Sequence, residues 1–275
     1  MGQNWLNILG MWSWEPSILI GTGVFISAYL LAVGPMRKRI TSVGSIKRGQ
    51  IVWFGLGTLV ILFALISPLD PLGDEYLFSA HMIQHMLLAM IAPPLLLFGT
   101  PGWLVEAIIR RTPVRRTALF LTRPATAFLL FNIIYLGWHI PVLYEAALNN
   151  ETIHIFEHLL FMMTGVINWW PILSPTPELP RLSYPGQALY LFLEAVPCTI
   201  LGAIISFAPT VMYPTYAVAA RILPLNPMDD QQIAGLVMAM PAGMIYLVAF
   251  SVVFLKWLES ENRPSALQQD PKTHS

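Results

Sequence analysis

The chain has 275 residues, of which 56% are hydrophobic and 11% are charged, and its formal net charge is zero. A soluble domain carries about 25% charged residues, so this composition excludes an ordinary soluble protein and indicates an integral membrane protein. Its few basic clusters are expected to set membrane orientation and not to bind nucleic acid. The single cysteine, Cys198, excludes an internal disulfide and a CxxC metal motif.

Seven apolar runs have the length of membrane-spanning helices, about 17–25 residues, although the fourth is short. The runs lie at 17–35, 50–67, 78–99, 125–140, 152–170, 187–208 and 232–256. We therefore predict an all-α integral membrane protein, a bundle of seven transmembrane helices forming one domain over residues 1–275, with a polar tail at 260–275. Residues 1–16 contain no Lys or Arg, so we expect the first run to be a retained anchor and not a cleaved signal peptide.

Basic residues are distributed unevenly over the loops between these runs. Of the fifteen Lys and Arg residues, all except Arg221 fall in alternate loops or at the C-terminal end. Cytoplasmic loops of membrane proteins are enriched in Lys and Arg. The distribution therefore places the N-terminus outside and the C-terminus in the cytoplasm. Five prolines within 171–185 predict an extended cytoplasmic strap between the fifth and sixth helices.

Five of the six histidines occur in a pattern typical of metal ligands. His81 and His85 are four residues apart, as are His154 and His158, so each pair lies on one face of a helix. His139 ends the fourth run. With the predicted orientation, all five lie at the outer membrane level, where a metal ion would satisfy several imidazoles at once. The alternative is that these are interfacial histidines bonded to loop carbonyls.

Neighbouring side chains bear on the identity of the metal. Met82 and Met86 flank the first histidine pair, and thioethers together with imidazoles favour Cu(I), although methionine is also common packing material. Glu157, Asp230 and Gln231 are expected at the same level as the histidines. They would orient the imidazoles, or serve as ordinary polar residues near helix N-termini.

Glu194 lies inside the sixth run and Asn132 inside the fourth. A carboxyl group within the membrane is by default a candidate functional group. The alternative is a structural role, in which a protonated Glu194 donates a hydrogen bond to a residue such as Asn132.

A resemblance to a known family is carried by six segments: HMIQHMLL, APPLLLFGTP, GWHIP, HIFEH, NWWPILSPTPELPRLSYP and DDQQIAGLVM. They are similar to the seven-helix, CtaG-type cytochrome c oxidase assembly factors of bacteria over residues 50–256. The resemblance implies a non-enzymatic chaperone in the bacterial cytoplasmic (inner) membrane that handles copper for a haem–copper oxidase. Its implied partners are the oxidase subunits and periplasmic copper chaperones. Its implied copper ligands are His81, His85, His139, His154 and His158.

Two other functions remain open. A membrane-embedded zinc hydrolase acting on a lipid would use three histidines and an activated water, with Asp230 or Glu157 as the base. A haem protein would use histidines from two helices as axial ligands. Zinc and haem are therefore the alternatives to copper, and the absorption spectrum distinguishes haem from both metals.

Overall fold

The computed structural model of the protein describes residues 10–40 and 44–268, with side chains described as far as residue 262. The described residues form helices and connecting segments, with no strand among them. The last seven residues of the predicted polar tail, including His274, lie outside these residues. The helices are α2 (Pro16–Val33), α3 (Arg37–Ile40), α4 (Arg48–Ile66), α5 (Leu69–Glu75), α6 (Phe78–Met86), the π-helical turn η1 (Leu87–Ile91), α7 (Ala92–Gly99), α8 (Gly102–Ile108), α9 (Thr112–Leu121), α10 (Pro124–Trp138), α11 (Pro141–Leu148), α12 (Glu151–Leu173), α13 (Tyr184–Ser206), α14 (Pro214–Val218) and α15 (Pro227–Gln268).

The described part of the chain contains five helical segments that are long and apolar enough to cross a membrane. They are α2, α4, the continuous segment Phe78–Gly99, α13 and α15, and a sixth arises if α9 and α10, bent by 71° to each other, form one span. α12 has 23 residues but is not among the five, and it carries His154, Glu157 and His158. The prediction of an all-helical, multi-pass membrane protein is confirmed.

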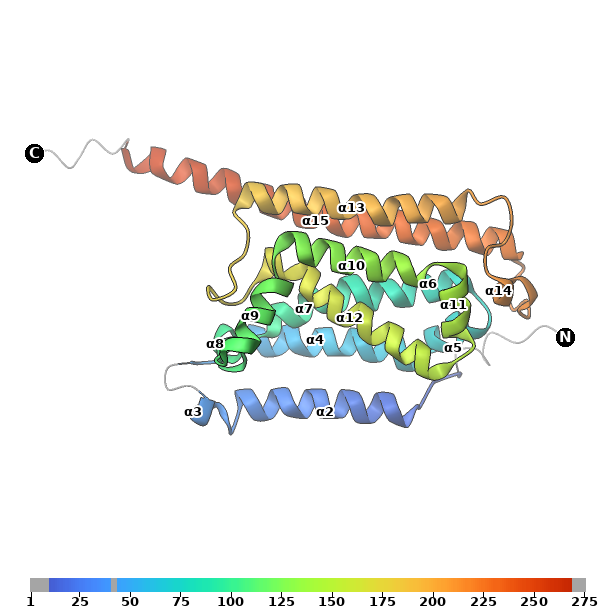
Figure 1. Cartoon of the computed structure of the whole chain (residues 1–275), viewed down its shortest axis with the longest axis horizontal. Coiled ribbons are helices and arrows are strands. Elements are labelled where there is room, and N and C mark those ends of the chain that lie inside the picture. Colours follow the sequence, from blue (N-terminus) through green and yellow to red (C-terminus); the bar gives the residue numbers. More distant parts are fainter. Residues whose placement is uncertain (1–9, 41–43, 269–275) are drawn as a thin grey trace, which may run out of the picture.

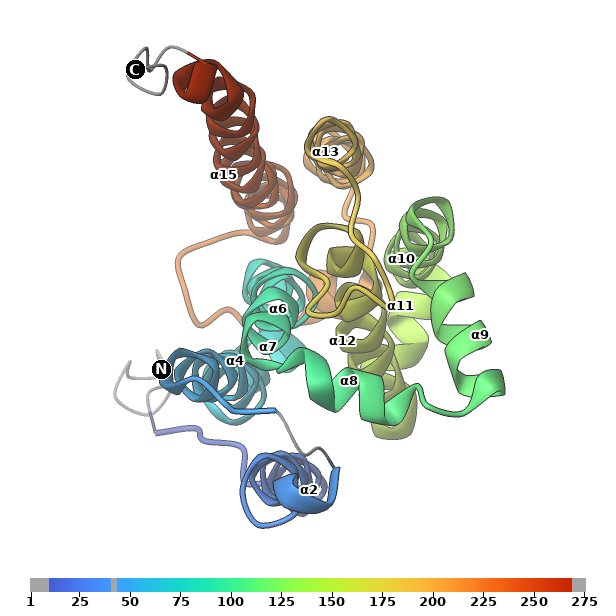
Figure 2. The same ribbon diagram turned by 90° about the vertical axis from the view of Figure 1, so that its left-hand side faces the viewer.

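The long helices lie roughly parallel, with α2 at one edge of the bundle and α13 beside α15 at the other (Figure 1). α6, α10 and α12 lie between these edges, as the end-on view shows (Figure 2). The largest buried apolar cluster draws residues from α6, α10, α12, α13 and α15. α2 is peripheral, because Tyr29 and Val33 are its only buried side chains.

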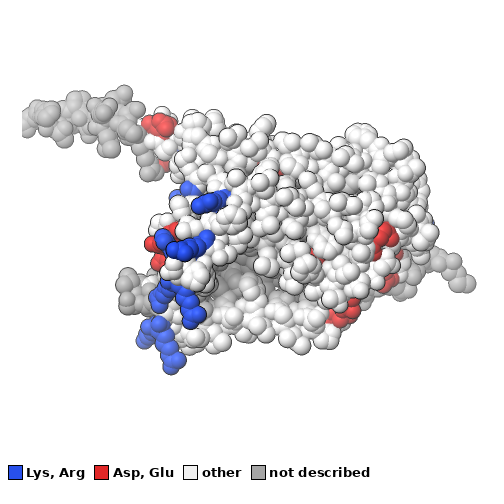
Figure 3. Space-filling view, viewed as in Figure 1, with Lys and Arg blue, Asp and Glu red and all other residues white. Residues whose placement is uncertain are grey.

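The two ends of the bundle differ in charge. Lys and Arg side chains gather at the end formed by α8 and α9, which we call the basic end (Figure 3). The opposite end, formed by α5, α11 and α14, is called the histidine end. α2 begins at the histidine end and α15 runs out at the basic end (Figure 1). The unequal distribution of basic residues in the sequence is therefore an unequal distribution in space.

The predicted proline strap is shorter than expected. α12 continues to Leu173, so Pro171 lies inside the helix, and the irregular connection covers 174–183 instead of 171–185. Proline in the last turn interrupts little of the helix, since few further backbone bonds depend on it. The freed Pro171 carbonyl accepts a hydrogen bond from the Leu182 amide at 2.8 Å, which folds the strap back onto the helix end.

A close crossing holds α12 against the segment η1–α7. A Cβ atom on Gly165 would lie 2.5 Å from the Ala89 carbonyl oxygen and 2.8 Å from Pro93 Cγ. Only glycine fits this distance of approach. The crossing lies at the π-helical turn, which begins two residues after His85 and is a local irregularity often found at functional sites. It therefore brings the helices that carry the two histidine pairs together.

Candidate metal centre

Four histidines from α6 and α12 converge at the histidine end of the bundle. His81, His85, His154 and His158 each offer one ring nitrogen, and these four atoms all lie within 4.8 Å of one another. The Nε2 atoms of His81 and His85 are 2.7 Å apart, and the rings of His81 and His154 stack with their centroids 5.3 Å apart. The helical crossing thus unites the two sequence pairs in one group, which we call the histidine cluster.

His139 lies at the edge of the histidine cluster. Its ring centroid is 5.7 Å from that of His85, but its nitrogens are not part of the four-atom group. Its Nδ1 lies 2.6 Å from the Tyr135 carbonyl oxygen, which can only accept, so Nδ1 carries the proton. In the neutral ring Nε2 therefore holds the lone pair, and this atom is buried without a hydrogen-bond partner. Such an arrangement orients an imidazole for metal binding.

The cluster contains more polar atoms than its own hydrogen bonds satisfy. His85 Nδ1, the Nε2 atoms of His154 and His158, and both carboxyl oxygens of Glu157 are buried without a hydrogen-bond partner. Glu157 is 1% exposed, and its Oε1 lies 3.8 Å from His85 Nε2, too far for a hydrogen bond. Each unsatisfied buried group costs about 1–3 kcal/mol. A cation among these atoms would satisfy several of them together.

The donor set fits a transition-metal ion. Metal–imidazole bonds of about 2 Å require donor nitrogens about 3–4 Å apart. The four candidate nitrogens lie within 4.8 Å of one another, so a small inward movement would bring them to this separation. Imidazole nitrogen suits both copper and zinc. Four candidate donors, supplied as two i, i+4 pairs, are enough to hold one ion.

Asp74 is the acidic residue that the sequence reasoning missed. It lies on α5, where its Oδ1 is 3.2 Å from His81 Nδ1 and its Oδ2 is 3.5 Å from His154 Nδ1. α5 packs so closely on α6 that a Cβ on Gly73 would lie 2.9 Å from the His81 Cα atom. The available signal was an aspartate seven residues before His81, in the short segment between the second and third predicted spans.

An aromatic cap covers the cluster at the histidine end. It consists of Phe78, Tyr144, Tyr213 and Tyr216, all buried. The Tyr216 hydroxyl donates to the Gly73 carbonyl at 2.8 Å and lies 3.1 Å from the Tyr144 hydroxyl, while the Tyr213 hydroxyl donates to the His139 carbonyl at 2.8 Å. The Tyr144 and His81 ring centroids are 5.3 Å apart. The cap separates the imidazoles from the space beyond α11 and α14.

Asp230 and Gln231 act on the backbone and make no hydrogen bond to an imidazole. The Asp230 carboxylate accepts hydrogen bonds from the amides of Phe78 and Ser79, at 2.7 and 3.2 Å, and so caps the N-terminus of α6. The Gln231 side chain accepts from the Met212 amide at 2.7 Å and donates to the Thr210 carbonyl at 3.1 Å. The expectation that they orient imidazole N–H groups is replaced by an indirect role, because Asp230 fixes the helix that carries His81 and His85.

The two predicted thioether donors are both buried. Met82 belongs to the apolar core that also contains Phe161, and Met86 is buried one turn further along α6. Met82 therefore packs in the apolar core beside the histidine cluster.

Glu194 forms a second buried polar site, between α10 and α13. Asn132 Nδ2 donates to Glu194 Oε2 at 3.1 Å and to the Phe128 carbonyl at 2.9 Å. The pairing of Glu194 with Asn132 was expected, but in the opposite sense, since Glu194 accepts the bond. Glu194 Oε1 is buried without a partner.

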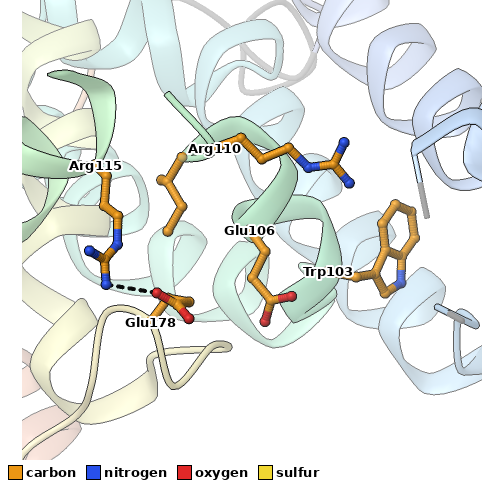
Figure 4. A pocket seen from close by; sticks show the side chains of 6 residues that line it. Trp103, Glu106, Arg110, Arg115 and Glu178 are labelled. Carbon is orange, nitrogen blue, oxygen red and sulfur yellow. Dashed lines mark hydrogen bonds and ion pairs between the residues drawn. The ribbon is translucent and has the colours of Figure 1, made fainter. Parts of the chain in front are cut away.

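A separate pocket of about 330 Å³ lies at the basic end (Figure 4). Its charged side chains are already paired. Arg115 Nη2 lies 2.8 Å from Glu178 Oε2, Glu106 accepts from the Thr176 hydroxyl at 2.9 Å, and Arg110 donates to the Ile40 carbonyl at 2.5 Å. This pocket therefore lacks the unsatisfied polar atoms that mark the histidine cluster.

The fold and the cluster define a multi-pass helical membrane protein with a buried group of histidines at one end. The chain matches the family described as "Cytochrome c oxidase caa3 assembly factor (Caa3_CtaG)" over residues 27–260. It belongs to this family, and the match begins earlier than the 50–256 indicated by the motifs.

Relatives of the chain occur in mycobacteria. A Mycobacterium bovis protein described as uncharacterized is 28% identical over 205 residues, which cover 67% of this chain and 30% of the relative. A Mycobacterium leprae protein with the same description is 25% identical over 273 residues, covering 91% of this chain and 40% of the relative. The chain thus spans well under half the length of these curated relatives. No solved structure matches it.

Proposed function

We propose that this protein is a non-enzymatic cytochrome c oxidase assembly factor that binds copper as cargo and supports its insertion into the catalytic subunit of a haem–copper oxidase. The family supports the assembly role. The observation that carries the copper role is the four-nitrogen group of His81, His85, His154 and His158. The protein's own contribution is to hold these imidazoles close together, screen them from water with the aromatic cap, and release the ion to a partner.

The proposed ion is Cu(I), held by the histidine cluster with His139 as a further donor. Transfer of the ion to a partner requires ligands that the partner's own ligands can replace one at a time, and separate imidazoles meet this requirement. The proposed partners are the oxidase subunits, as recipients, and periplasmic copper chaperones, as donors.

In the proposed membrane arrangement, α2, α4, α6–α7, α10, α12, α13 and α15 form seven spans in the bacterial cytoplasmic membrane. The basic end faces the cytoplasm, as the positive-inside rule requires, and the histidine end faces outward. An epitope tag after α11 is expected to be accessible from outside the cell, and one in the connection 174–183 from the cytoplasm. A tag after α11 that is accessible only from the cytoplasm would refute this orientation.

The test of the copper site is copper per polypeptide, measured by elemental analysis on protein purified without a polyhistidine tag. The double variant His85→Ala/His158→Ala is expected to lose copper, since one donor is removed from each helix. His274→Ala is the control, because this residue lies in the predicted polar tail. Unchanged copper in the double variant would refute the site.

A second candidate function is supported by Glu157 and by the surroundings of His154. A buried carboxyl beside three or more imidazoles is also the donor set of a zinc hydrolase with an activated water. Both His154 and His158 line a largely apolar cavity in which a lipid chain would fit. Zinc in place of copper in the purified protein, with Glu157-dependent lipid hydrolysis, would favour this function. A Soret band would instead identify a haem protein.

A further inference from the structure

The histidine cluster borders a cavity that the proposed function does not yet use. This cavity of about 670 Å³ lies between α2 and α12, with α4 and α5 behind it. Figure 3 shows the surface hollowed between α2 and the helices above it. On α12, the lining residues Leu159 and Met163 are 48% and 61% exposed, so the cavity opens on the side of the bundle.

The two halves of this cavity differ in chemistry. Toward the basic end its walls are apolar, with side chains such as Phe25, Leu96 and Val166. Toward the histidine end the lining side chains are polar or acidic, and we call this part the acidic mouth: Ser13, Glu15, Ser17, Asp70, Asp74, Glu151, His154 and His158. The acidic mouth contains four carboxyl groups and no Lys or Arg among the residues that line it.

The other sides of the cluster are closed within the described residues. The aromatic cap covers it toward α11 and α14, and Phe161 packs on His85 with ring centroids 4.8 Å apart. His81, His85, His139 and His158 are all buried. Among the cluster and its acidic neighbour Asp74, the exposed side chains are those of His154, which is 12% exposed, and Asp74, which is 31% exposed. Both line the cavity. The buried His158 also lines it and has an unpartnered Nε2.

We propose that the metal ion reaches the histidine cluster sideways, through the acidic mouth between α2 and α12, and does not pass through the aromatic cap. This inference rests on the proposed function, because it takes copper as the cargo. The carboxyl groups raise the local concentration of cations, Asp74 lies beside both His81 and His154, and His154 is the first imidazole to be reached. α2 forms the outer wall of this portal.

The packing of α2 fits that role. Near the basic end it is fastened, since the Tyr29 and Phe54 rings stack with centroids 3.5 Å apart and the Tyr29 hydroxyl donates to the Gly99 carbonyl at 2.8 Å. Toward the histidine end, Gly21 lines the cavity, and a Cβ atom built on it meets no heavy atom within 4 Å. A side chain can therefore be introduced at position 21, beside the cavity, without a clash at its Cβ atom.

Gly21 and Gly23 offer a matched pair of variants for testing the portal. A Cβ at either position meets open space, but Gly23 does not belong to the cavity lining. We expect Gly21→Trp to lose most of the initial rate of Cu(I) uptake while reaching the same final copper per polypeptide. Gly23→Trp should match the wild type in both quantities. Wild-type uptake rates in Gly21→Trp would overturn the proposal.

The acidic mouth has its own test, the salt dependence of uptake. Neutralising Glu15 and Glu151 together, as Glu15→Gln/Glu151→Gln, should slow Cu(I) uptake about tenfold at low ionic strength, the scale on which fixed charges steer ions. High salt should remove the difference. Glu75→Gln/Asp229→Asn is the charge-matched control, because both residues are exposed at the same end and neither lines the cavity. An equal effect of both changes would overturn the steering role of the acidic mouth.

Labelling of a cysteine separates failure of the portal from failure of the proposed function. In a Cys198→Ser background, His154→Cys should react with a cationic methanethiosulfonate reagent, more slowly after Gly21→Trp and unchanged after Gly23→Trp. If the wild type takes up no copper, the proposed function fails, and labelling alone decides whether the portal exists. Labelling that is unaffected by Gly21→Trp would refute it.

Discussion

Adding one methyl group at Gly165 should disable the histidine cluster from a distance. Gly165 lies seven residues beyond His158 on α12, about 10 Å along the helix axis. The new Cβ would lie 2.5 Å from the Ala89 carbonyl oxygen, whereas ordinary contact begins at 3.4 Å. α12 must therefore move away from η1 by about 0.9 Å, the difference of these distances, because a backbone oxygen cannot rotate aside.

This displacement is large on the scale of a metal site. Ligand distances hold to within about 0.2 Å, and binding constellations tolerate about 0.5 Å. We expect Gly165→Ala to lower the affinity for Cu(I) about 10- to 100-fold, the range seen when the support of metal ligands is disturbed. The overpacking itself should cost about 1–3 kcal/mol of stability.

The assay is competition for Cu(I) against a chromophoric chelator, with thermal unfolding of the same samples as the measure of stability. Gly55→Ala on α4 is the control, since the same methyl group there meets no heavy atom within 4 Å. Wild-type affinity in Gly165→Ala, in protein with an unaltered membrane fold, would show that this crossing does not set the cluster geometry.

Three further predictions concern other polar side chains. Glu194→Gln should unfold at nearly the wild-type temperature and Glu194→Ala at a lower one. Only alanine leaves Asn132 Nδ2 without its acceptor at 3.1 Å, which costs about 1–3 kcal/mol. If both variants lost oxidase activity equally at normal protein levels, a titrating carboxylate would be required instead. Asp230→Ala should destabilise the protein by about 1–2 kcal/mol, because α6 loses the cap at its N-terminus. Asp229→Ala is the control, and an unchanged free energy of unfolding in Asp230→Ala would exclude the capping role. Burial, reinforced by the nearby Asp74, raises the pKa of Asp70 from 3.8 to about 7. Between about pH 4 and 7 the folded protein therefore binds one proton more than the unfolded chain, so its melting temperature should fall as the pH rises through that window. An equal fall in the Asp70→Asn variant would refute this assignment.

The helical architecture was largely predictable from the sequence. Apolar runs of about 20 residues have few structural alternatives, so the long helices fall within a few residues of the predicted spans, except α15, which begins five residues earlier and continues to Gln268, into the predicted polar tail. The i, i+4 spacing likewise fixed each histidine pair on one helix face, and the alternating basic loops placed both pairs at one level. These conclusions depend on local periodicity and on charge, which a single sequence displays.

The missed features depend on tertiary contacts without a periodic signal. Asp74 faces His81 because Gly73 allows α5 to lie against α6. The sequence does not indicate which residue will pack against a glycine in a short connecting segment. Asp230 was expected at the right level, but its carboxylate is taken by amides of another helix, a pairing that spans 152 residues. The end of α12 was misplaced because proline is tolerated in a last helical turn, where its cost is small.

The cap of α6 has a consequence for the order in which the chain matures in the membrane. The ribosome delivers both histidine pairs by residue 158, but Tyr213, Tyr216 and Asp230 emerge later. Until α15 has been inserted, the start of α6 lacks its acceptor, and until residues 213–216 have emerged the aromatic cap is incomplete. Metal captured by a partly synthesised chain would therefore be held loosely and exchange with the surroundings. With copper as the proposed cargo, tight retention is therefore expected only after the last helix has been inserted.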